Sequence, residues 1–145
     1  MAALKVRFKK LSFNAVVPKK AHAGDAGFDL TAISMTADKY GNVVYGFGLA
    51  VEIPKNHVGL LFPRSSNAKK DILLSNSVGC IDSGFRGEIK AKFKPLSLSS
   101  SADFYSVGDR VCQLIIMPYP EVEFEEVDEL SKTDRGTGGY GSTGK

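Results

Sequence analysis

Residues 88–93, EIKAKF, alternate charged and apolar side chains without a break. Successive side chains of a β-strand point to opposite faces, so Ile89, Ala91 and Phe93 would share one face and the charged residues the other. The alternation predicts an antiparallel strand with one face in a core and the other in water.

The same period of two recurs on both sides of this stretch. LKVRF at residues 4–8 and EVEF at residues 121–124 repeat it, the latter with Val122 and Phe124 as its apolar positions. Residues 42–54, NVVYGFGLAVEIP, and residues 57–63, HVGLLFP, predict further strands that end at prolines. Most of the chain is therefore expected to form strands.

Two stretches differ from this pattern. RVCQLIIMP, residues 110–118, is apolar on both faces, which predicts either a central strand or one that meets another subunit. In PRSSNAKKDI, residues 63–72, Ser65 or Ser66 could cap a short helix that runs toward Lys70, and its free N–H groups would suit an anion. We therefore predict an all-β protein, a β-barrel of jelly-roll character with one short helix.

The bulk properties limit the classes of protein to consider. A length of 145 residues suits one domain, and the net charge of +3 suits small anionic ligands but does not by itself indicate nucleic-acid binding. No apolar run is long enough to span a membrane, and the first residues lack the pattern of a signal peptide. Cys80 and Cys112 lie in apolar surroundings, which predicts two buried free thiols and a reducing cytoplasm, that of a host cell if the protein is viral.

The end of the chain has a different composition. Residues 135–145, RGTGGYGSTGK, are rich in glycine and almost free of apolar side chains, so they cannot build a core. We predict a barrel domain over residues 1–134 and a flexible arm over residues 135–145 that orders on binding. The arm also matches the phosphate-loop pattern GxxxxGK up to Lys145, but that loop continues through Ser or Thr into a helix, within a strand–helix–strand unit that this sequence lacks.

Two stretches carry polar groups that could serve either folding or chemistry. Asp29, in AGDAGFDLTA at residues 23–32, could cap a turn, or could hold a metal-bound water or a substrate hydroxyl. Arg64, Ser65 and Ser66 could be a capped helix start with a surface arginine, or a surface that binds phosphate oxygens.

Three further stretches raise the same question. Asp82 follows the apolar run VGCI and starts DSGFRG, a hairpin turn or longer loop, where a carboxylate could take a proton from water. Phe85 in that loop could cover the core edge or contact a ligand, and Gln113 could bond a neighbouring strand or a ligand. The arm could be solvated, or its glycines could bring backbone amides close to phosphates.

In this order and spacing, these five stretches resemble the trimeric dUTPase family, over about Ala21 to Lys145. The resemblance implies a jelly-roll β-barrel assembled as a homotrimer, with three active sites between subunits that each take motifs from all three chains. It implies hydrolysis of dUTP to dUMP and pyrophosphate, with Mg²⁺ held mainly by the triphosphate. That activity limits uracil in DNA and supplies dUMP for dTMP synthesis.

The resemblance also implies a role for individual residues. Asp82 would be the general base that activates the attacking water, and Asp29 would steady the metal through bound water. Phosphates would be bound by Arg64, Ser65, Ser66 and Gln113, and the base and sugar by Asn76, the backbone near Gly79 and Ile81, and Phe85. Lys90 would also bind the substrate. The arm residues Arg135, Tyr140, Gly141, Ser142 and Thr143 would close over the nucleotide.

This sequence departs from the family pattern at a few positions. Ser66 replaces a glycine, Asn67 a leucine, Phe85 a tyrosine and Tyr140 a phenylalanine, and the last two exchanges keep an aromatic ring. The RSS sequence also occurs in the related trimeric dCTP deaminases, but these need a glutamate ten residues after the aspartate, where this chain has Lys92. A deaminase and a nucleotide-gated regulator on the same scaffold are the alternatives.

Overall fold

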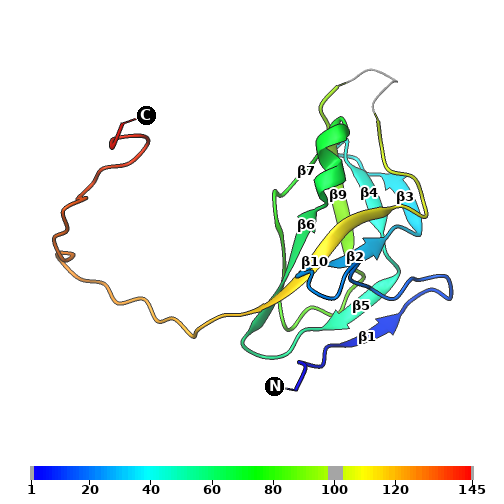
Figure 1. The fold of residues 1–145 in the computed structure, drawn as a ribbon, viewed down its shortest axis with the longest axis horizontal. Coiled ribbons are helices and arrows are strands. Elements are labelled where there is room, and N and C mark those ends of the chain that lie inside the picture. The colour runs from blue at the N-terminus through cyan, green and yellow to red at the C-terminus, as the bar shows by residue number, and fades with distance from the viewer. Residues whose placement is uncertain (1, 98–102, 145) are drawn as a thin grey trace.

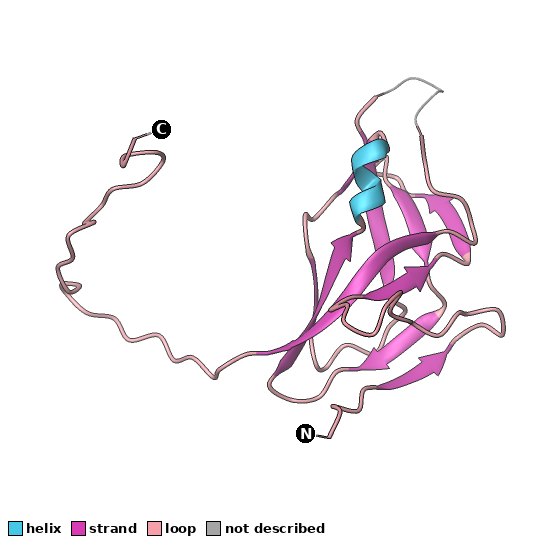
Figure 2. Ribbon diagram, in the orientation of Figure 1, coloured by secondary structure: helices cyan, strands magenta, loops and turns pink. Residues whose placement is uncertain are grey.

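The computed structural model describes residues 2–97 and 103–144. Figures 1 and 2 show that these residues form strands with a single short helix, which confirms the predicted all-β class. The elements are β1 (Arg7–Lys10), β2 (Phe28–Thr31), β3 (Ser34–Ala37), β4 (Val43–Gly46), β5 (Leu49–Glu52), β6 (His57–Pro63), the 3₁₀ helix η1 (Ser65–Lys69), β7 (Ile72–Leu74), β8 (Gly79–Ile81), β9 (Lys90–Pro95) and β10 (Arg110–Pro118).

Two four-stranded antiparallel sheets make up the barrel. Their strand orders are β2-β10-β6-β8 and β3-β4-β9-β7, and β1 pairs with β5 in a third, two-stranded sheet. β10 lies between β2 and β6, which confirms the central strand predicted from its two apolar faces. Its register places Gln113 opposite Asp29 on one side and opposite Phe62 on the other.

The core lies between the sheets. In β9 the side chains of Ala91 and Phe93 are buried, as is that of Ile89 just before it, while Lys90 and Lys92 are exposed, as the alternation predicts. Phe93 packs edge-to-face against Tyr45, with ring centroids 5.7 Å apart. Burial raises the pKa of Tyr45 to about 12, so its hydroxyl keeps its proton and can donate a hydrogen bond inside the core.

Two predicted half-buried strands are wrong in the single chain. All four residues of β1 are exposed and the strand begins only at Arg7; of the predicted apolar face, Leu4 and Phe8 are 52% and 45% exposed, and only Val6 packs against the core. Residues 121–124 form no strand, and Val122 and Phe124 are 67% and 96% exposed. Alternation shows which face of a segment is apolar, but it does not show what covers that face.

Two local predictions also need correction. The N-cap of η1 is Arg64, which makes no side-chain capping bond; the predicted caps Ser65 and Ser66 lie inside the helix, and the Ser66 hydroxyl bonds Tyr105. Cys80 is exposed, since it points outward from β8 between two buried neighbours, whereas Cys112 is buried as predicted and burial raises its thiol pKa to about 12. Both thiols are free.

The loop after β8 is not a hairpin. β8 pairs with β6 in one sheet, whereas β9 pairs with β4 and β7 in the other, so residues 82–89 cross from one sheet to the other. This is the longer loop that the sequence left open, and it carries Asp82 and Phe85 across the open end between the sheets.

After Pro118 the chain leaves the barrel. Residues 119–144 contain no strand or helix and run away from the sheets (Figure 1). Lys145, the last residue of the GxxxxGK match, lies outside the described residues. None of the described segments is a helix long and apolar enough to cross a membrane.

Candidate active site

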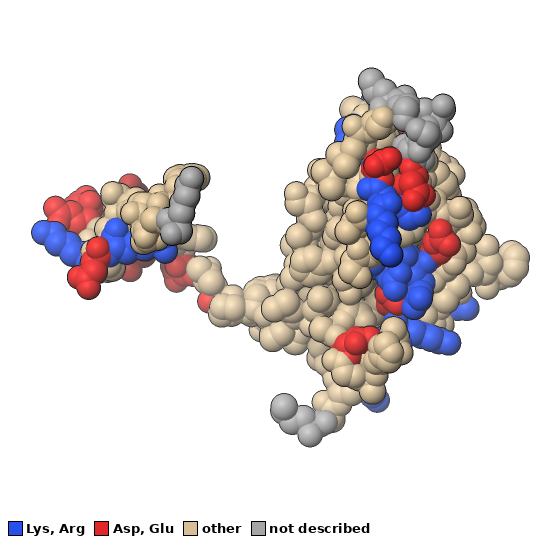
Figure 3. Space-filling view, turned by 45° about the horizontal axis from the view of Figure 1, so that its top comes forward, with Lys and Arg blue, Asp and Glu red and all other residues tan. Residues whose placement is uncertain are grey.

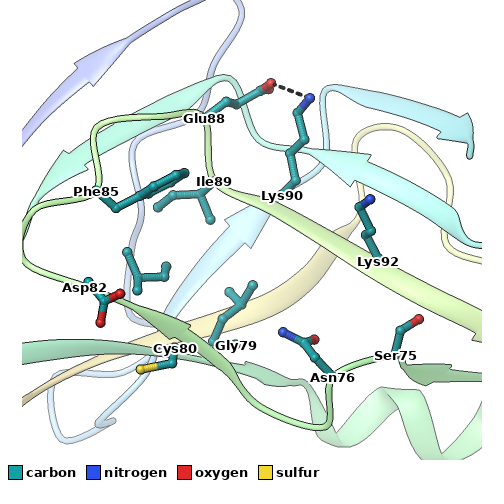
Figure 4. A pocket seen from close by; sticks show the side chains of 12 residues that line it. Ser75, Asn76, Gly79, Cys80, Asp82, Phe85, Glu88, Ile89, Lys90 and Lys92 are labelled. Atoms are coloured by element: carbon teal, nitrogen blue, oxygen red, sulfur yellow. Dashed lines mark ion pairs between the residues drawn. The ribbon is translucent and has the colours of Figure 1, made fainter.

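A pocket of about 430 Å³ opens beside β8 and the loop that follows it. Figure 4 shows Asp82 and Phe85 at one end of this pocket, and Ser75 and Asn76 at the other. We call it the base-side pocket, because the family resemblance would place the nucleobase there. It brings together six of the predicted site residues: Asn76, Gly79, Ile81, Asp82, Phe85 and Lys90.

Two glycines shape this pocket, because their lack of a side chain lets neighbouring groups approach the backbone closely. A Cβ atom on Gly79 would lie 2.9 Å from the Leu61 Cβ atom, so only glycine lets β8 approach β6 this closely. A Cβ atom on Gly87 would lie 2.6 Å from the Phe85 Cζ atom, so Gly87 leaves room for the ring against the backbone. The Phe85 ring is 44% exposed and available to a ligand.

Asp82 is exposed directly after β8. Among the described residues, no group forms a hydrogen bond or an ion pair with its carboxylate, so both oxygens can accept a proton or a water hydrogen. The loop around it is held in place, because the Phe85 N–H donates to the Asp82 carbonyl oxygen at 3.1 Å, and the Arg86 guanidinium donates to the Ser83 and Phe85 carbonyl oxygens at 2.6 and 3.0 Å. Asp82 is therefore a free carboxylate on a fixed loop.

The other charged groups of this pocket are already paired. Glu88 accepts the Gly48 N–H at 2.9 Å and pairs with Lys90 at 3.5 Å, the contact marked in Figure 4. The Lys92 ammonium lies 3.0 Å from the Asp38 carboxylate. The side-chain hydrogen bond from Asn42, followed by backbone bonds and Lys92, holds the pKa of Asp38 well below its usual value.

A second pocket, of about 320 Å³, lies at the other edge of the same sheet. It brings together four more predicted residues: Asp29, Arg64, Ser65 and Gln113. The Asp29 side chain caps no turn, and its two oxygens lie 2.9 Å from Arg64 Nε and 3.0 Å from an Arg110 guanidinium nitrogen. Gln113 donates its side-chain N–H to the Pro63 carbonyl oxygen at 3.2 Å, so it bonds a neighbouring strand while it also lines this pocket. We call this second pocket the phosphate-side pocket, because the family resemblance would place the phosphates there.

Arg110 was not predicted as a site residue. It lies 81 positions from Asp29 in the sequence, and the β2–β10 pairing brings the two together. The signal was present in GDRVCQL, where a charged residue precedes an apolar strand, but its partner depends on the strand pairing, which the sequence does not show directly.

The predicted arm residues contact neither pocket lining. Arg135 donates to the Gly138 carbonyl oxygen at 3.0 Å within its own turn, and Tyr140 is fully exposed with a positive φ of 53°. Gly141, Ser142 and Thr143 are exposed beside it. In a single chain, the arm lies apart from both groups of predicted residues (Figure 1).

The two pockets are also separated from each other. In the order β2-β10-β6-β8, Asp29 lies on one edge strand and Asp82 follows the other. Three strand spacings of about 4.8 Å place these edges roughly 14 Å apart along the sheet. One chain therefore does not combine the free carboxylate with the cationic group.

The fit of a metal ion follows from the donor set. Within residues 2–97 and 103–144, no three His, Cys, Asp or Glu side chains are grouped so that they could hold a metal ion. Asp29 is a single carboxylate between two guanidinium groups. The arrangement therefore does not fit a protein-bound metal, but it fits a Mg²⁺ ion held by phosphate oxygens of a ligand, with Asp29 acting through water.

Charge is unevenly distributed between the barrel and the segment that leaves it. Residues 119–134 hold seven acidic side chains and one lysine. Figure 3 shows acidic side chains along this segment, and Lys and Arg side chains gathered on a face of the barrel. The segment and the barrel are thus electrostatically complementary.

Comparison with known families places the chain. The family model described as dUTPase matches residues 14–144. The chain belongs to the dUTPase family.

Bacterial relatives support this assignment. The deoxyuridine 5'-triphosphate nucleotidohydrolase of Rhodococcus erythropolis is 40% identical over 143 residues, which covers 97% of this chain and 87% of the relative. The enzyme of the same name from Corynebacterium glutamicum is also 40% identical, and the match covers 100% of this chain and 97% of the relative.

Solved dUTPase structures share the fold. A variant of the Staphylococcus bacteriophage 80alpha dUTPase, solved with dUpNHpp, superimposes with a TM-score of 0.84 at 26% identity and covers 99% of this chain and 100% of that chain. Another structure of this phage protein, with dUPNHPP, superimposes with a TM-score of 0.81 at 27% identity and covers 99% of this chain and 100% of that chain. The work on that structure describes phage dUTPases that control transfer of virulence genes by a proto-oncogenic G protein-like mechanism.

Proposed function

We propose that this protein hydrolyses dUTP to dUMP and pyrophosphate. The observation that carries the proposal is the free Asp82 carboxylate beside a pocket lined by Asn76 and Phe85, in a chain of the dUTPase family. Such an activity limits the incorporation of uracil into DNA and supplies dUMP for dTMP synthesis. The exposed free thiol of Cys80 suits a reducing cytoplasm.

Asp82 acts as the general base in this proposal. Its carboxylate accepts a proton from a water molecule, and the water oxygen forms a bond to the α-phosphorus of dUTP. The bond from that phosphorus to the bridging oxygen breaks, and pyrophosphate leaves with the electron pair. None of the described residues forms a hydrogen bond or an ion pair with the Asp82 carboxylate, so a water molecule can approach its oxygens.

The base-side pocket selects the nucleoside. Asn76 and the backbone near Gly79 and Ile81 present hydrogen-bonding groups to a pyrimidine edge, and uracil and cytosine have opposite donor and acceptor patterns at that edge. Phe85 supports the deoxyribose and leaves no room for a 2′-hydroxyl. Lys90 lines the same pocket and contributes to substrate binding.

The phosphate-side pocket binds the triphosphate. Arg64, held at its Nε by Asp29, presents its remaining guanidinium donors beside Ser65, Gln113 and the backbone amide of Ser66. Mg²⁺, bound mainly by the triphosphate and reached by Asp29 through water, would offset the charge that builds up on the phosphates. The arm, through Arg135, Tyr140 and residues 141–143, closes over the nucleotide.

A homotrimer with shared sites accounts for the separation of these groups. Asp82 of one subunit, the Asp29 group of a second and the arm of a third would form each site. The exposed Val122 and Phe124 give residues 119–134 an apolar face that none of the described residues covers, and the acidic residues of this segment suit the basic barrel of another copy. Light scattering should give a mass near three times the chain's 15.6 kDa.

The alternatives are less well supported by the pocket. The position at which deaminases carry a glutamate is Lys92, and Glu88, which lines the pocket together with Asp82, is bound to Gly48 and Lys90. The regulatory mechanism described for phage dUTPases concerns proteins about 27% identical to this one. We therefore place hydrolysis of dUTP ahead of both.

A nucleotide panel tests the proposal. The purified protein is incubated with dUTP, dCTP, dTTP or UTP, with Mg²⁺ or with EDTA, and pyrophosphate and ammonia are measured. Release of pyrophosphate from dUTP alone, suppressed by EDTA, is the expected result. Ammonia from dCTP, or no pyrophosphate from dUTP, would overturn it.

A further inference from the structure

Ser65 and Ser66 are adjacent in η1 but lie in different environments. Ser65 is exposed and lines the phosphate-side pocket, whereas Ser66 is half-buried and absent from that lining. The Ser66 hydroxyl lies 2.9 Å from the hydroxyl of Tyr105. One serine therefore faces the pocket, and its neighbour ties the same turn to the interior of the barrel.

Tyr105 is firmly held in the core. Its side chain and backbone are 4% exposed, and its ring packs edge-to-face against Tyr45 and Phe93, with centroid distances of 6.2 and 6.4 Å. Its carbonyl oxygen also accepts the Tyr45 hydroxyl at 2.9 Å. The Tyr105 hydroxyl is thus a fixed point presented by the core to η1.

The other end of η1 is tied to the same segment. Lys70, directly after the helix, places its ammonium 5.1 Å from the centroid of the Tyr105 ring and donates to the Phe104 carbonyl oxygen at 3.3 Å. Ser66 and Lys70 therefore connect both ends of the turn to residues 104–105. We call the Ser66–Tyr105 contact the tyrosine latch.

The turn has few other means of staying in place. η1 buries none of its five residues and has no side-chain cap. Beyond the bonds within the helix itself, its backbone is closed at the two ends by the Asn67 N–H on the Arg64 carbonyl oxygen and the Lys70 N–H on the Asn67 carbonyl oxygen, and the Asn67 side-chain amide donates to the Ile72 carbonyl oxygen. A short 3₁₀ turn without buried apolar groups depends on such polar contacts for its conformation.

We propose that Tyr105 is a positioning residue for polyphosphate binding, acting through Ser66. The latch fixes the turn so that the backbone amides of Ser65 and Ser66 point at the phosphates before the ligand arrives. Donors that are already in place need no reorganisation when charge is bound, which strengthens binding. The inference rests on the proposed function, which assigns the triphosphate to this pocket.

The latch should be tested with nucleotides that differ in phosphate content. Tyr105→Phe keeps the ring and its packing but removes the hydroxyl, and we expect it to weaken binding of dUpNHpp about fivefold, the equivalent of the ~1 kcal/mol of one hydrogen bond. Deoxyuridine, which has no phosphate, should bind the variant and the parent protein equally. Tyr40→Phe, which removes an exposed hydroxyl at 65% exposure, is the matched control and should change neither affinity. Equal weakening of both ligands would overturn the proposal.

A double-mutant cycle identifies the partner. Ser66→Ala should weaken dUpNHpp binding as much as Tyr105→Phe, and the two together should cost no more than one alone. Ser66→Thr keeps the hydroxyl, so its binding of dUpNHpp should be close to that of the parent protein and stronger than that of Ser66→Ala. Losses that add would show that the two hydroxyls act separately, and would overturn the latch.

Amide hydrogen exchange without nucleotide separates this inference from the proposed function. Exchange at residues 65–70 should be about fivefold faster in Tyr105→Phe and in Ser66→Ala than in the parent protein, while exchange in β9 and β10 stays the same. If the nucleotide panel gives no hydrolysis of dUTP but the exchange result is as expected, the latch holds the turn, and only the assignment of the dUTP triphosphate to this pocket is wrong. If exchange at residues 65–70 is unchanged in both variants, the latch does not hold the turn. If Tyr105→Phe does not fold, Ser66→Ala carries the same test from the other partner.

Discussion

Asp82 and Asp29 lie at opposite edges of one four-stranded sheet, and their surroundings are opposite in kind. Asp82 is exposed and no described residue bonds its carboxylate, whereas the Asp29 side chain is 13% exposed and both of its oxygens meet arginines. A carboxylate that takes a proton must be left free of cations, which would lower its basicity. A carboxylate that fixes the direction of guanidinium groups is most useful when both of its oxygens are bound to them.

Removal of the free carboxylate should have the largest effect. Asp82→Asn keeps the shape of the side chain but cannot accept the proton of water, so we expect kcat to fall about 100- to 10,000-fold, the usual contribution of a general base. Binding of dUpNHpp should change little, because the Asp82 side chain bonds none of the described residues and its backbone bond to Phe85 is kept. Steady-state kinetics and calorimetric titration of the same preparations would measure both.

Asp71→Asn is a suitable control for this prediction. It makes the same change of charge at an exposed aspartate that lines none of the pockets described above. A near-normal kcat for Asp82→Asn would show that the base is another group, and the contrast between the two aspartates would lose its meaning.

Deletion of residues 135–145 asks whether the two pockets suffice without the arm. Arg135 would contribute a charge-assisted hydrogen bond to the terminal phosphate, worth about 1.5–3 kcal/mol, so kcat/KM should fall roughly 10- to 100-fold. Residues 119–134, with Val122 and Phe124, remain, and light scattering should still give a trimer. Kinetics on dUTP and the mass in solution are the two measurements.

Two outcomes of the deletion would contradict the proposed role of the arm. A monomer after deletion would mean that residues 135–145 hold the assembly together, and unchanged kinetics would mean that the two pockets act without them.

The same contrast shows how far the sequence can be read. β9 was predicted correctly, because its alternation and its burial are both local to six residues and the core beside them. The exposed faces of β1 and residues 121–124 were predicted to be buried, because the pattern records an apolar face but not the neighbour that would cover it. Among the described residues, nothing covers Val122 and Phe124, and the core covers only Val6 of the first stretch.

Site residues follow a similar division. Asp82 could be proposed from its position after an apolar run, because its carboxylate bonds none of the described residues and its surroundings did not have to be known. The state of Asp29 could not, since it depends on Arg64 and on Arg110, 35 and 81 positions away, which strand pairing and register bring to it. The resemblance to a family predicted which residues form the site, but it did not predict that they lie in two separate pockets of one chain.

The smallest effect should come from the paired carboxylate. Asp29→Asn keeps one acceptor oxygen but leaves Arg64 and Arg110 with less compensation, and it removes the charge through which a metal-bound water would be held. We expect kcat/KM to fall about tenfold, the effect of one weakened charge-assisted bond, with kcat much less affected than in Asp82→Asn. The Mg²⁺ concentration for half-maximal rate should rise in Asp29→Asn and stay constant in Asp82→Asn.

Glu52→Gln offers the matched comparison for that last prediction. Glu52 is also a carboxylate between two arginines, 2.6 Å from Arg7 and 3.7 Å from Arg86, but it lies outside both pockets of the site. If the loss of any such ion pair disturbed the protein equally, both variants would change the Mg²⁺ requirement. A shift in Asp29→Asn alone would assign the effect to the place of Asp29 beside the phosphates, whereas an unchanged requirement would limit Asp29 to orienting Arg64 and Arg110.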